Sequence, residues 1–311
     1  MENLTKDMFQ PTSQEDRNVD KIRRPSIKYW PDVWRRLRQN KLAMTGLILI
    51  ILMAIMSIVG TGINGFKYYE QNYELINVKP NGIHWFGTDE LGRDLFTRVW
   101  FGARYSLFIG VAAAFIDFIL GVLYGGISGM ASRRVDAIMM RIAEVIYSIP
   151  YLLVVILLSV VLSKDKSGSS MFVMILAMTI TSWVPMAILV RGQVLQLKEA
   201  EYALAAESLG APKSWILKKH IIPNTLGPIL VNITLAIPQA IFAEATLSFL
   251  GLGLQPPKAS LGSLASDGLA GLAVGNAYQI LIPAIFISLI MFAFNVLGDG
   301  LRDALDPRLR K

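Results

Sequence analysis

Six long apolar runs constrain the fold of this sequence more than any other feature. Each is about 20 residues long, the length at which a helix crosses the hydrocarbon core of a membrane. The runs lie at residues 43–62, 105–128, 137–162, 171–190, 227–253 and 277–297. Hydrophobic residues make up 53% of the chain and charged residues only 17%, which is more apolar than a soluble domain. The sequence therefore predicts an all-α polytopic membrane protein with six transmembrane helices.

The placement of basic residues predicts the topology. They precede the first run, separate the second from the third and close the chain: Lys21, Arg23, Arg24, Lys28, Arg35, Arg36, Arg38, Lys41, Arg133, Arg134, Arg302, Arg308, Arg310 and Lys311. Because loops rich in Lys and Arg remain in the cytoplasm, both termini should be cytoplasmic. The net charge of +7 then reflects topology rather than nucleic-acid binding.

This topology divides the chain into three parts. A cytoplasmic N-terminal segment is followed by a six-span domain and a cytoplasmic C-terminal tail, at 1–42, 43–297 and 298–311. Inside the six-span domain, residues 65–104 form an extracytoplasmic loop and residues 191–226 a cytoplasmic loop.

The sequence carries no signature of a catalytic or metal centre. It has no Cys and only two His residues, His84 and His220, which are too few and too far apart for a typical zinc site. It contains no GxxxxGK[ST], HExxH or GxSxG motif. We therefore expect no catalytic residue, no metal ligand and no cofactor bound by this chain.

Three carboxylates, Asp117, Glu144 and Glu244, fall within or near the apolar runs. Ionisable groups are costly in a membrane and usually face the interior of the bundle or a water-filled path. Two roles remain open for them: a structural, hydrogen-bonded carboxylate or a group that lines the substrate path.

Small residues and prolines predict where the helices pack and bend. Gly121, Gly125 and Gly129 are spaced four residues apart, which favours close approach of another helix. Four prolines in or beside the runs can kink or break the helices: Pro150, Pro185, Pro238 and Pro283.

The water-facing stretch EYALAAESLGAPKSWILKKHIIPN, residues 201–224, predicts two short helices. Gly210 stops the first helix, Pro212 starts the second and Pro223 ends it. Its small side chains and apolar anchors suit docking to a partner: Ala203, Ala205, Ala206, Trp215 and Ile216. An amphipathic loop on the membrane surface, held to anionic lipid by Lys213, Lys218 and Lys219, is the alternative.

This stretch resembles the EAA loop of membrane subunits of ABC importers, which forms their coupling helices. Ala205, Ala206, Gly210 and Pro223 match that loop in type and spacing, whereas Leu204 stands where the family has Glu. Glu207 offers a nearby charge.

Two further stretches resemble the C-type membrane subunit of the oligopeptide, dipeptide and nickel importers. They are FGTDELGRDLFTRVWFGARYSL, residues 86–107, and NVLGDGLRDALDPRLR, residues 295–310. The likeness extends from about residue 30 to the end of the chain.

The resemblance implies the type I ABC importer permease fold and a role as one half of a heterodimeric channel in the prokaryotic plasma membrane. The implied partners are a related second permease, two cytoplasmic ATPases that carry ATP and Mg²⁺, an extracytoplasmic substrate-binding protein and membrane lipid. The chain itself would be no enzyme. Its residues for ATPase coupling would be Ala205, Ala206, Glu207, Gly210 and Pro223. Peptides are the expected substrates, oligopeptides ahead of dipeptides, with nickel complexes as an alternative.

The string GTDELGRD forms an extracytoplasmic motif made of Gly87, Thr88, Asp89, Gly92, Arg93 and Asp94. Its glycines permit tight turns, and its charged side chains can form ionic contacts. We expect an ordered loop that touches the binding protein or the second permease; a purely internal role is the alternative.

Two rival functions come from other classes. An ion-gradient-driven secondary transporter would use Asp117 or Glu244 for coupling. A membrane-embedded enzyme would need a nucleophile and a base at matched depth, and no such pair is evident.

Overall fold

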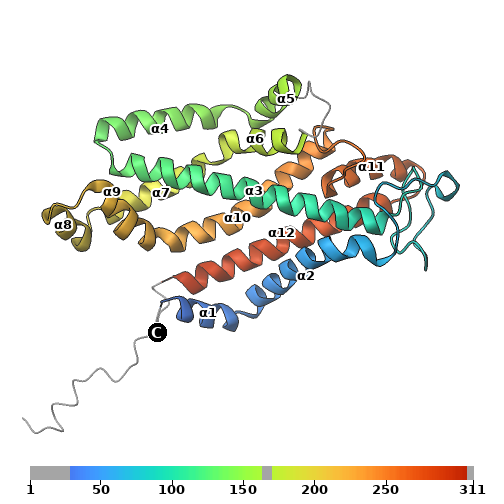
Figure 1. Cartoon of the computed structure of the whole chain (residues 1–311), viewed down its shortest axis with the longest axis horizontal. Coiled ribbons are helices and arrows are strands. Elements are labelled where there is room, and N and C mark those ends of the chain that lie inside the picture. The colour runs from blue at the N-terminus through green and yellow to red at the C-terminus, as the bar shows by residue number, and fades with distance from the viewer. Residues whose placement is uncertain (1–28, 163–169, 307–311) are drawn as a thin grey trace, which may run out of the picture.

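The computed structural model describes residues 29–162 and 170–306, in which helices alone form the named elements (Figure 1). The long helices and those between them are α1 (Tyr29–Gln39), α2 (Lys41–Ile63), the 3₁₀ turn η3 (Tyr73–Leu75), α3 (Leu95–Met130), α4 (Arg133–Ser148), α5 (Tyr151–Leu162), α6 (Ser170–Ser182), α7 (Val184–Leu197), α8 (Glu201–Ser208), α9 (Lys213–Ile216), the π-helical turn η4 (Leu217–Ile221), α10 (Ile222–Phe249), α11 (Leu261–Ala273) and α12 (Tyr278–Leu305). Seven of the basic residues used for the topology lie outside the described residues: Lys21, Arg23, Arg24, Lys28, Arg308, Arg310 and Lys311.

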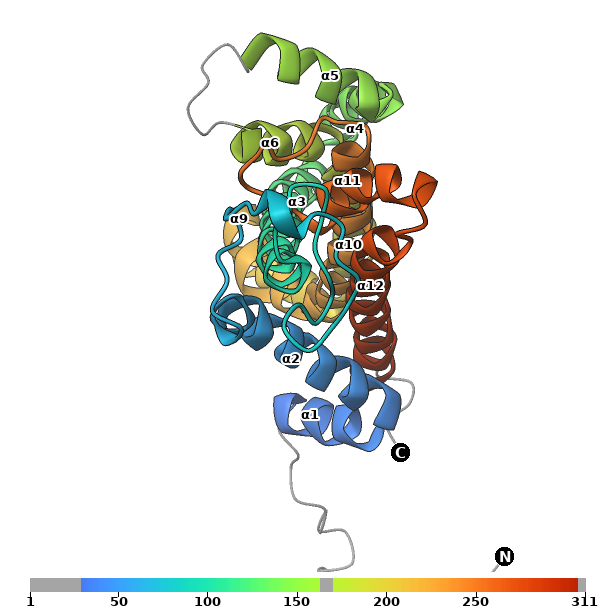
Figure 2. The same ribbon diagram turned by 90° about the vertical axis from the view of Figure 1, so that its right-hand side faces the viewer.

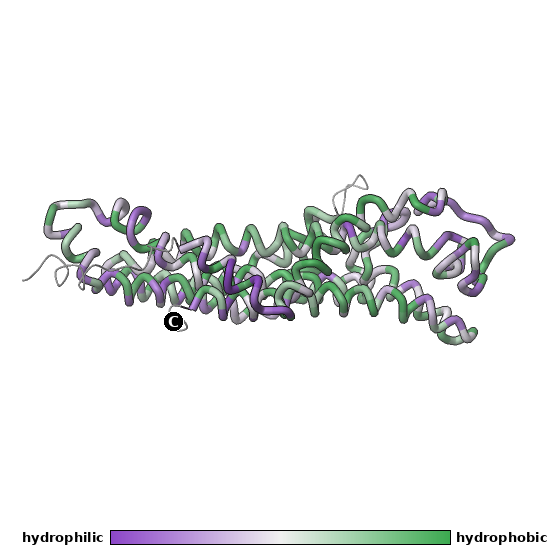
Figure 3. Tube along the Cα trace, turned by 90° about the horizontal axis from the view of Figure 1, so that it is seen from below, coloured by the Kyte–Doolittle hydropathy of each residue, from purple (hydrophilic) through white to green (hydrophobic). Residues whose placement is uncertain are grey.

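The helices form an elongated bundle. α8 and α9 lie at one end of it, and α11 lies with the loop after α2 at the other (Figure 1). We call these the α8 end and the α11 end. Seen along the bundle, α3 and α10 occupy the middle, α4 and α5 lie at one edge, and α1 lies at the opposite edge (Figure 2). Hydrophobic residues dominate the long helices, and hydrophilic residues gather toward the ends and on a short helical stretch between them (Figure 3).

Four helices in the described part of the chain are long and apolar enough to cross a membrane: Lys41–Ile63, Leu95–Met130, Lys213–Phe249 and Tyr278–Leu305. Two bent helix pairs bring the number to six when each pair counts as one span. The prediction of an all-α membrane protein is confirmed, but two of the six predicted spans are broken rather than straight.

The third predicted span breaks between α4 and α5, which are bent by 74°. The break falls at Ile149 and Pro150, because proline lacks a backbone N–H and disfavours a helical conformation in the residue before it. The fourth predicted span bends by 41° between α6 and α7, at Trp183, just before Pro185.

Several helices extend beyond the limits predicted from the sequence. α3 begins at Leu95 because the Asp94 side chain caps it by accepting from the Thr97 N–H, so residues 95–104 are helix rather than loop. α12 continues to Leu305, into the predicted tail. In the predicted N-terminal segment, α1 packs Val33 and Leu37 against α12.

The prediction that Pro223 ends the second short helix is wrong. Residues Lys213–Phe249 form one continuous helix made of α9, η4 and α10. The π-helical turn Leu217–Ile221 directly precedes Pro223, which lies in the first turn of α10. A proline is tolerated there because the wider turn before it shifts the backbone hydrogen bonds, as in the bond from the Ile222 N–H to the Leu217 carbonyl.

The glycine stripe of α3 packs against α7, as its spacing predicted. A Cβ atom on Gly129 would lie 2.7 Å from Val194 Cβ, and one on Gly125 would overlap the Ala187 carbonyl group. The two backbones therefore touch along the half of α3 nearest the α8 end.

Candidate functional site

The loop between α7 and α10 forms a compact corner at the α8 end. The Gly210 N–H donates to the Glu207 carbonyl at 2.9 Å, and the Ala211 N–H donates to the Ala206 carbonyl at 3.0 Å. Gly210 has a φ of +85°, so this is the glycine-based end of a helix known as a Schellman motif. The predicted helix and turn at Gly210 are confirmed.

Three apolar side chains fix this corner to the bundle. Ala203, Ile216 and Ile221 are buried in one cluster with Val190 and Val194 of α7. Of the predicted coupling residues, Ala206 packs against this cluster, and the other four are not part of it. Ala205, Glu207, Gly210 and Pro223 are exposed, and Ala206 is half-buried.

Three large apolar side chains of the corner are exposed. Leu209 is 89% exposed, and Trp215 and Tyr202 are 46% and 39% exposed. We call these three residues the apolar tip. Leu209 was not among the predicted site residues, because in the sequence it is only the last residue of a run of good helix formers. Its exposure follows from its position at the end of α8, next to Gly210.

A cavity of about 270 Å³ lies between the corner and the end of α3. Leu204 and Glu207 of α8 line it together with Lys198, Lys213 and Met130.

Beside the corner, a polar cluster joins three helices. Arg191 of α7 forms two hydrogen bonds with Asp136 of α4, with Nε 2.5 Å from Oδ1 and Nη2 2.6 Å from Oδ2. Ser128 of α3 donates to the same Asp136 Oδ1 at 2.5 Å. We call Ser128, Asp136 and Arg191 the Asp136 cluster. Sequence reasoning missed it because Asp136 and Arg191 are 55 residues apart.

The three predicted carboxylates lie in separate places. Glu144 is on the outside of α4, its side chain 55% exposed, and pairs with Arg141 at 2.9 Å. Asp117 is buried and accepts from the Ser182 hydroxyl at 2.8 Å. Glu244 is fully buried, so the structure places Asp117 and Glu244, but not Glu144, inside the bundle.

Serine hydroxyls surround Glu244. Ser106 of α3 and Ser248 of α10 each donate to its carboxylate at 2.7 Å. Ser106 also accepts from the Leu261 N–H at 3.2 Å, and Ser248 lies 3.2 Å from the hydroxyl of Ser260, the N-cap of α11. The Glu244 carboxylate therefore ties α3 and α10 to the start of α11.

The GTDELGRD motif lies at the α11 end, and its side chains have partners inside the chain. Asp94 Oδ2 caps α3 and accepts from Asn64 at 2.7 Å, while Asp94 Oδ1 lies 2.9 Å from His84 Nδ1. The Thr88 hydroxyl accepts from the Val78 N–H at 2.8 Å, and the Thr88 carbonyl accepts from Gln279 of α12 at 2.9 Å.

The glycines of the motif allow close backbone packing. Gly87 and Gly92 have φ values of +76° and +69°. A Cβ atom on Gly92 would collide with the Asn72 carbonyl oxygen. Thr88, Asp89, Arg93 and Asp94 are buried, so Glu90 is the charged residue of the motif that remains exposed.

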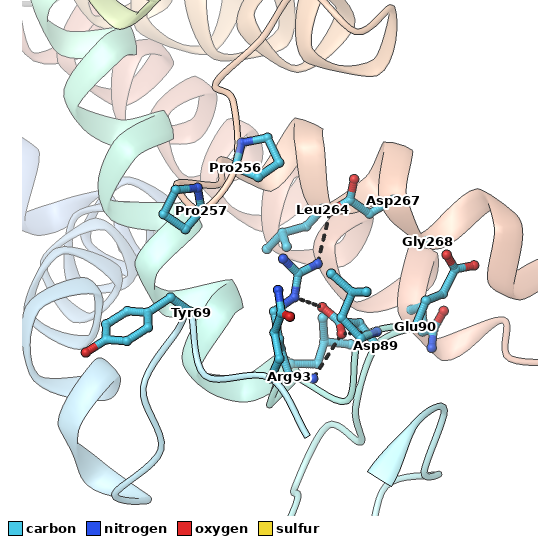
Figure 4. A pocket seen from close by; sticks show the side chains of 13 residues that line it. Tyr69, Asp89, Glu90, Arg93, Pro256, Pro257, Leu264, Asp267 and Gly268 are labelled. Atoms are coloured by element: carbon cyan, nitrogen blue, oxygen red, sulfur yellow. Dashed lines mark hydrogen bonds and ion pairs between the residues drawn. The ribbon is translucent and has the colours of Figure 1, made fainter. Parts of the chain in front are cut away.

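A pocket of about 520 Å³ opens next to the motif. Figure 4 shows Arg93 between Asp89 and Asp267, and Arg93 Nε donates to Asp89 at 2.7 Å. Arg98 reaches both carboxylates, at 3.3 Å and 3.4 Å. Partial burial raises the pKa of the Asp267 carboxyl, against the opposing effect of the two arginines. Tyr69, Pro256 and Pro257 form the opposite wall (Figure 4).

Within the described residues, no group of three or more His, Cys, Asp or Glu side chains is placed to hold a metal ion.

Known proteins similar to this chain are transport permeases. The family described as "Binding-protein-dependent transport system inner membrane component" matches residues 121–311, and the "N-terminal TM domain of oligopeptide transport permease C" matches residues 28–80. The "Oligopeptide transport system permease protein OppC" of Bacillus subtilis (strain 168) is 52% identical over 311 residues, which is 100% of both chains.

Two other relatives are of the same kind. The "Dipeptide transport system permease protein DppC" of Bacillus subtilis is 52% identical over 97% of this chain and 93% of its own length. The "Oligopeptide transport system permease protein OppC" of Haemophilus influenzae is 40% identical over 94% of this chain and 93% of its own length. The resemblance drawn from the three motifs is thereby confirmed. This multi-pass membrane chain belongs to the family of inner membrane components of binding-protein-dependent transport systems, and within it to the C-type permeases.

Proposed function

We propose that this chain is a channel-forming subunit of an ATP-driven importer of peptides, and that the corner between α7 and α10 receives the force of ATP hydrolysis from a partner ATPase. The apolar tip is the observation that carries this proposal. A leucine that is 89% exposed at the end of a helix loses hydrophobic free energy unless a partner covers it. A groove on an ATPase would cover Leu209 together with Tyr202 and Trp215.

The geometry behind the tip supports a role in force transmission. Ile216 and Ile221 are buried in the bundle, and they belong to the same continuous helix as α10. Because no loop separates the corner from α10, a displacement of the corner would move the start of α10 as well. ATP binding and hydrolysis in the partners would switch the channel between inward- and outward-facing states.

Peptides are the proposed substrates because the relatives above are named for oligopeptide or dipeptide transport. We favour oligopeptides, since the relative that aligns over the full length of both chains is an oligopeptide permease. Dipeptides are the second candidate, because the DppC relative is as similar to this chain as the OppC relative, at 52% identity.

The proposed assembly contains this chain, a related second permease, two cytoplasmic ATPases and an extracytoplasmic binding protein. In the proposed orientation the α8 end and both termini face the cytoplasm, because Arg35, Arg36, Arg38 and Lys41 flank the start of α2. The loop 64–94 and α11 then face outward, where Glu90 and the pocket beside Arg93 are available to the binding protein or the second permease.

The rival secondary transporter would need a carboxylate that loads and releases an ion. Glu244 has no exposed surface and is surrounded by hydroxyl groups that hold it in place, which favours a structural role.

The first experiment is purification of the chain from its native membranes in mild detergent, followed by mass spectrometry of the proteins that accompany it. We expect a second permease and ATP-binding subunits. The complex is then reconstituted in proteoliposomes, and uptake of labelled peptides is measured with and without ATP, with unlabelled dipeptides and longer peptides as competitors. Uptake that proceeds without ATP and stops when an ion gradient is dissipated would overturn the proposal.

The docking surface is tested by Leu209→Ser and Gly210→Arg, with Leu272→Ser as the control. Leu272 is also an exposed leucine, 48% accessible, but it lies on α11 at the opposite end. We expect the two variants at the corner to lose bound ATPase or ATP-dependent uptake at normal membrane levels, and the control to keep both. Normal uptake by both corner variants would remove the coupling assignment.

A further inference from the structure

α4 is held to the bundle by few contacts. Of its 16 residues, Asp136, Met140 and Ala143 are buried. Met140 and Ala143 pack against Trp183 and Ala187, in the middle of α4. In the first turn of α4, Asp136 is the one buried side chain, and its partners are Ser128 and Arg191.

The Asp136 cluster lies directly beside the proposed coupling corner. Arg191 is on α7, whose last residue, Leu197, is followed by Lys198 and then by α8. Lys198 donates to the Gly129 carbonyl at 3.2 Å, next to Ser128. The chain that leads into the corner is therefore joined to the end of α3 by a Lys198 hydrogen bond and, through Arg191, to the start of α4.

The chemistry of the cluster makes this junction rigid. A guanidinium that binds both oxygens of one carboxylate fixes the angle of the pair as well as its distance. The Asp136 side chain is 12% exposed and Ser128 is fully buried, whereas the Arg191 side chain is 30% exposed, so water can reach the cluster mainly from the guanidinium side. Near Arg191, the backbone of α7 is also in contact with Gly125 and Gly129 of α3.

We propose that the Asp136 cluster is a positioning element for transport, which makes α3, α4 and α7 move as one body when the coupling corner is displaced. α4 leads through the bend at Pro150 into α5, which packs Val155 against α6 and α3. The movement of the corner thereby reaches α5 at the edge of the bundle. This inference rests on the proposed function, because it describes how a displacement of the coupling corner would spread through the proposed importer.

The test is a reconstituted importer in which this chain carries Asp136→Asn or Arg191→Lys. Arg191→Lys keeps the charge but removes the two-point contact. Arg141→Gln is the matched control, because it breaks the exposed ion pair of Arg141 with Glu144 on the outside of the same helix. For each variant the amount of assembled complex, the ATPase rate with loaded binding protein, and the peptide imported per ATP hydrolysed are measured.

We expect the control to match the wild type, and the two cluster variants to hydrolyse ATP while the peptide imported per ATP falls several-fold. A purely structural role would lower the amount of complex and leave the ratio unchanged, which would overturn the proposal. If the complex with Asp136→Asn does not assemble, the amount of peptide imported per ATP by the Arg191→Lys complex decides. The exchange of both charges, Asp136→Arg with Arg191→Asp, should recover part of the lost coupling.

The wild-type complex separates this inference from the proposed function. If the wild type shows no ATP-dependent uptake, the proposed function fails. If the wild type transports and Arg191→Lys transports with the same ratio, only the role of the cluster fails.

Discussion

Asp117 of α3 accepts a hydrogen bond from Ser182, the residue at which α6 ends, at an oxygen–oxygen distance of 2.8 Å. Ser182 also contacts the Met178 carbonyl, so its hydroxyl lies between a helix backbone and a buried carboxylate. The contact holds the bend between α6 and α7 against the middle of α3.

Ser182→Ala should therefore destabilise the fold. The substitution leaves Asp117 without this donor, and a buried polar group that loses its partner costs about 1–3 kcal/mol. The measurement is thermal unfolding of the purified protein in detergent. Ser148→Ala is the control, because the Ser148 hydroxyl contacts the Val145 carbonyl on an exposed part of α4. An equal effect of the two substitutions would contradict a specific role of the Asp117 contact.

Glu244→Gln tests the structural interpretation of the buried carboxylate. Glutamine has the same shape and can still accept hydrogen bonds from Ser106 and Ser248 through its carbonyl oxygen. We expect an assembled complex with ATP-driven uptake close to that of the wild type. Loss of uptake by a well-assembled variant would instead favour a carboxylate that binds an ion during transport.

Gly92→Ala should disrupt the loop at the α11 end. The backbone at Gly92 has a φ of +69°, which L-residues rarely adopt, and a Cβ atom there would meet the Asn72 carbonyl group. We expect a lower yield of folded protein and faster proteolysis of the loop. Gly82→Ala is the matched control in the same loop, because no atom lies within 4 Å of the added Cβ.

Leu204→Glu restores the residue type that the EAA loop usually has at this position. Leu204 is 48% exposed and lines a cavity that contains Lys198 and Lys213 as well as Glu199 and Glu207, so an added carboxylate would have both positive and negative neighbours. We expect normal assembly and unchanged or stronger binding of the ATPase, measured by co-purification. Loss of the ATPase would show that its groove is apolar opposite Leu204, and would assign Leu204 a direct part in docking.

The lengths of the apolar runs were enough to predict the membrane architecture, because the hydrocarbon core sets the length of a spanning helix. The break near Pro150 was also visible, since proline removes a backbone donor. By contrast, the helix continues through Pro223, because a π-helical turn precedes that proline and such a turn leaves no pattern in the residue types. α11 was missed because its 13 residues are too few for a span and too apolar for a typical loop.

The corner at Gly210 could be predicted from the sequence because a helix, a glycine and a proline are local signals. The Asp136 cluster could not be predicted, because Asp136 and Arg191 are 55 positions apart and lie on helices that are not consecutive in the chain. Likewise, the composition of GTDELGRD suggested ionic contacts, but whether these would face a partner or the chain itself depended on how α11 and α12 pack beside it. The observed burial of Thr88 and Asp94 is evidence for internal contacts, and contact with the binding protein stays a prediction.

The continuous helix from Lys213 to Phe249 has a mechanical consequence. At about 1.5 Å per residue, its 37 residues form a rod roughly 55 Å long, which exceeds the thickness of the hydrocarbon core. Trp215 near one tip and Glu244 near the other belong to a single lever without a loop between them. In the proposed importer, a displacement at Trp215 would therefore reach the contact of Glu244 with Ser106 along one helix, and Pro228 and Pro238 inside α10 are the points at which this helix could bend.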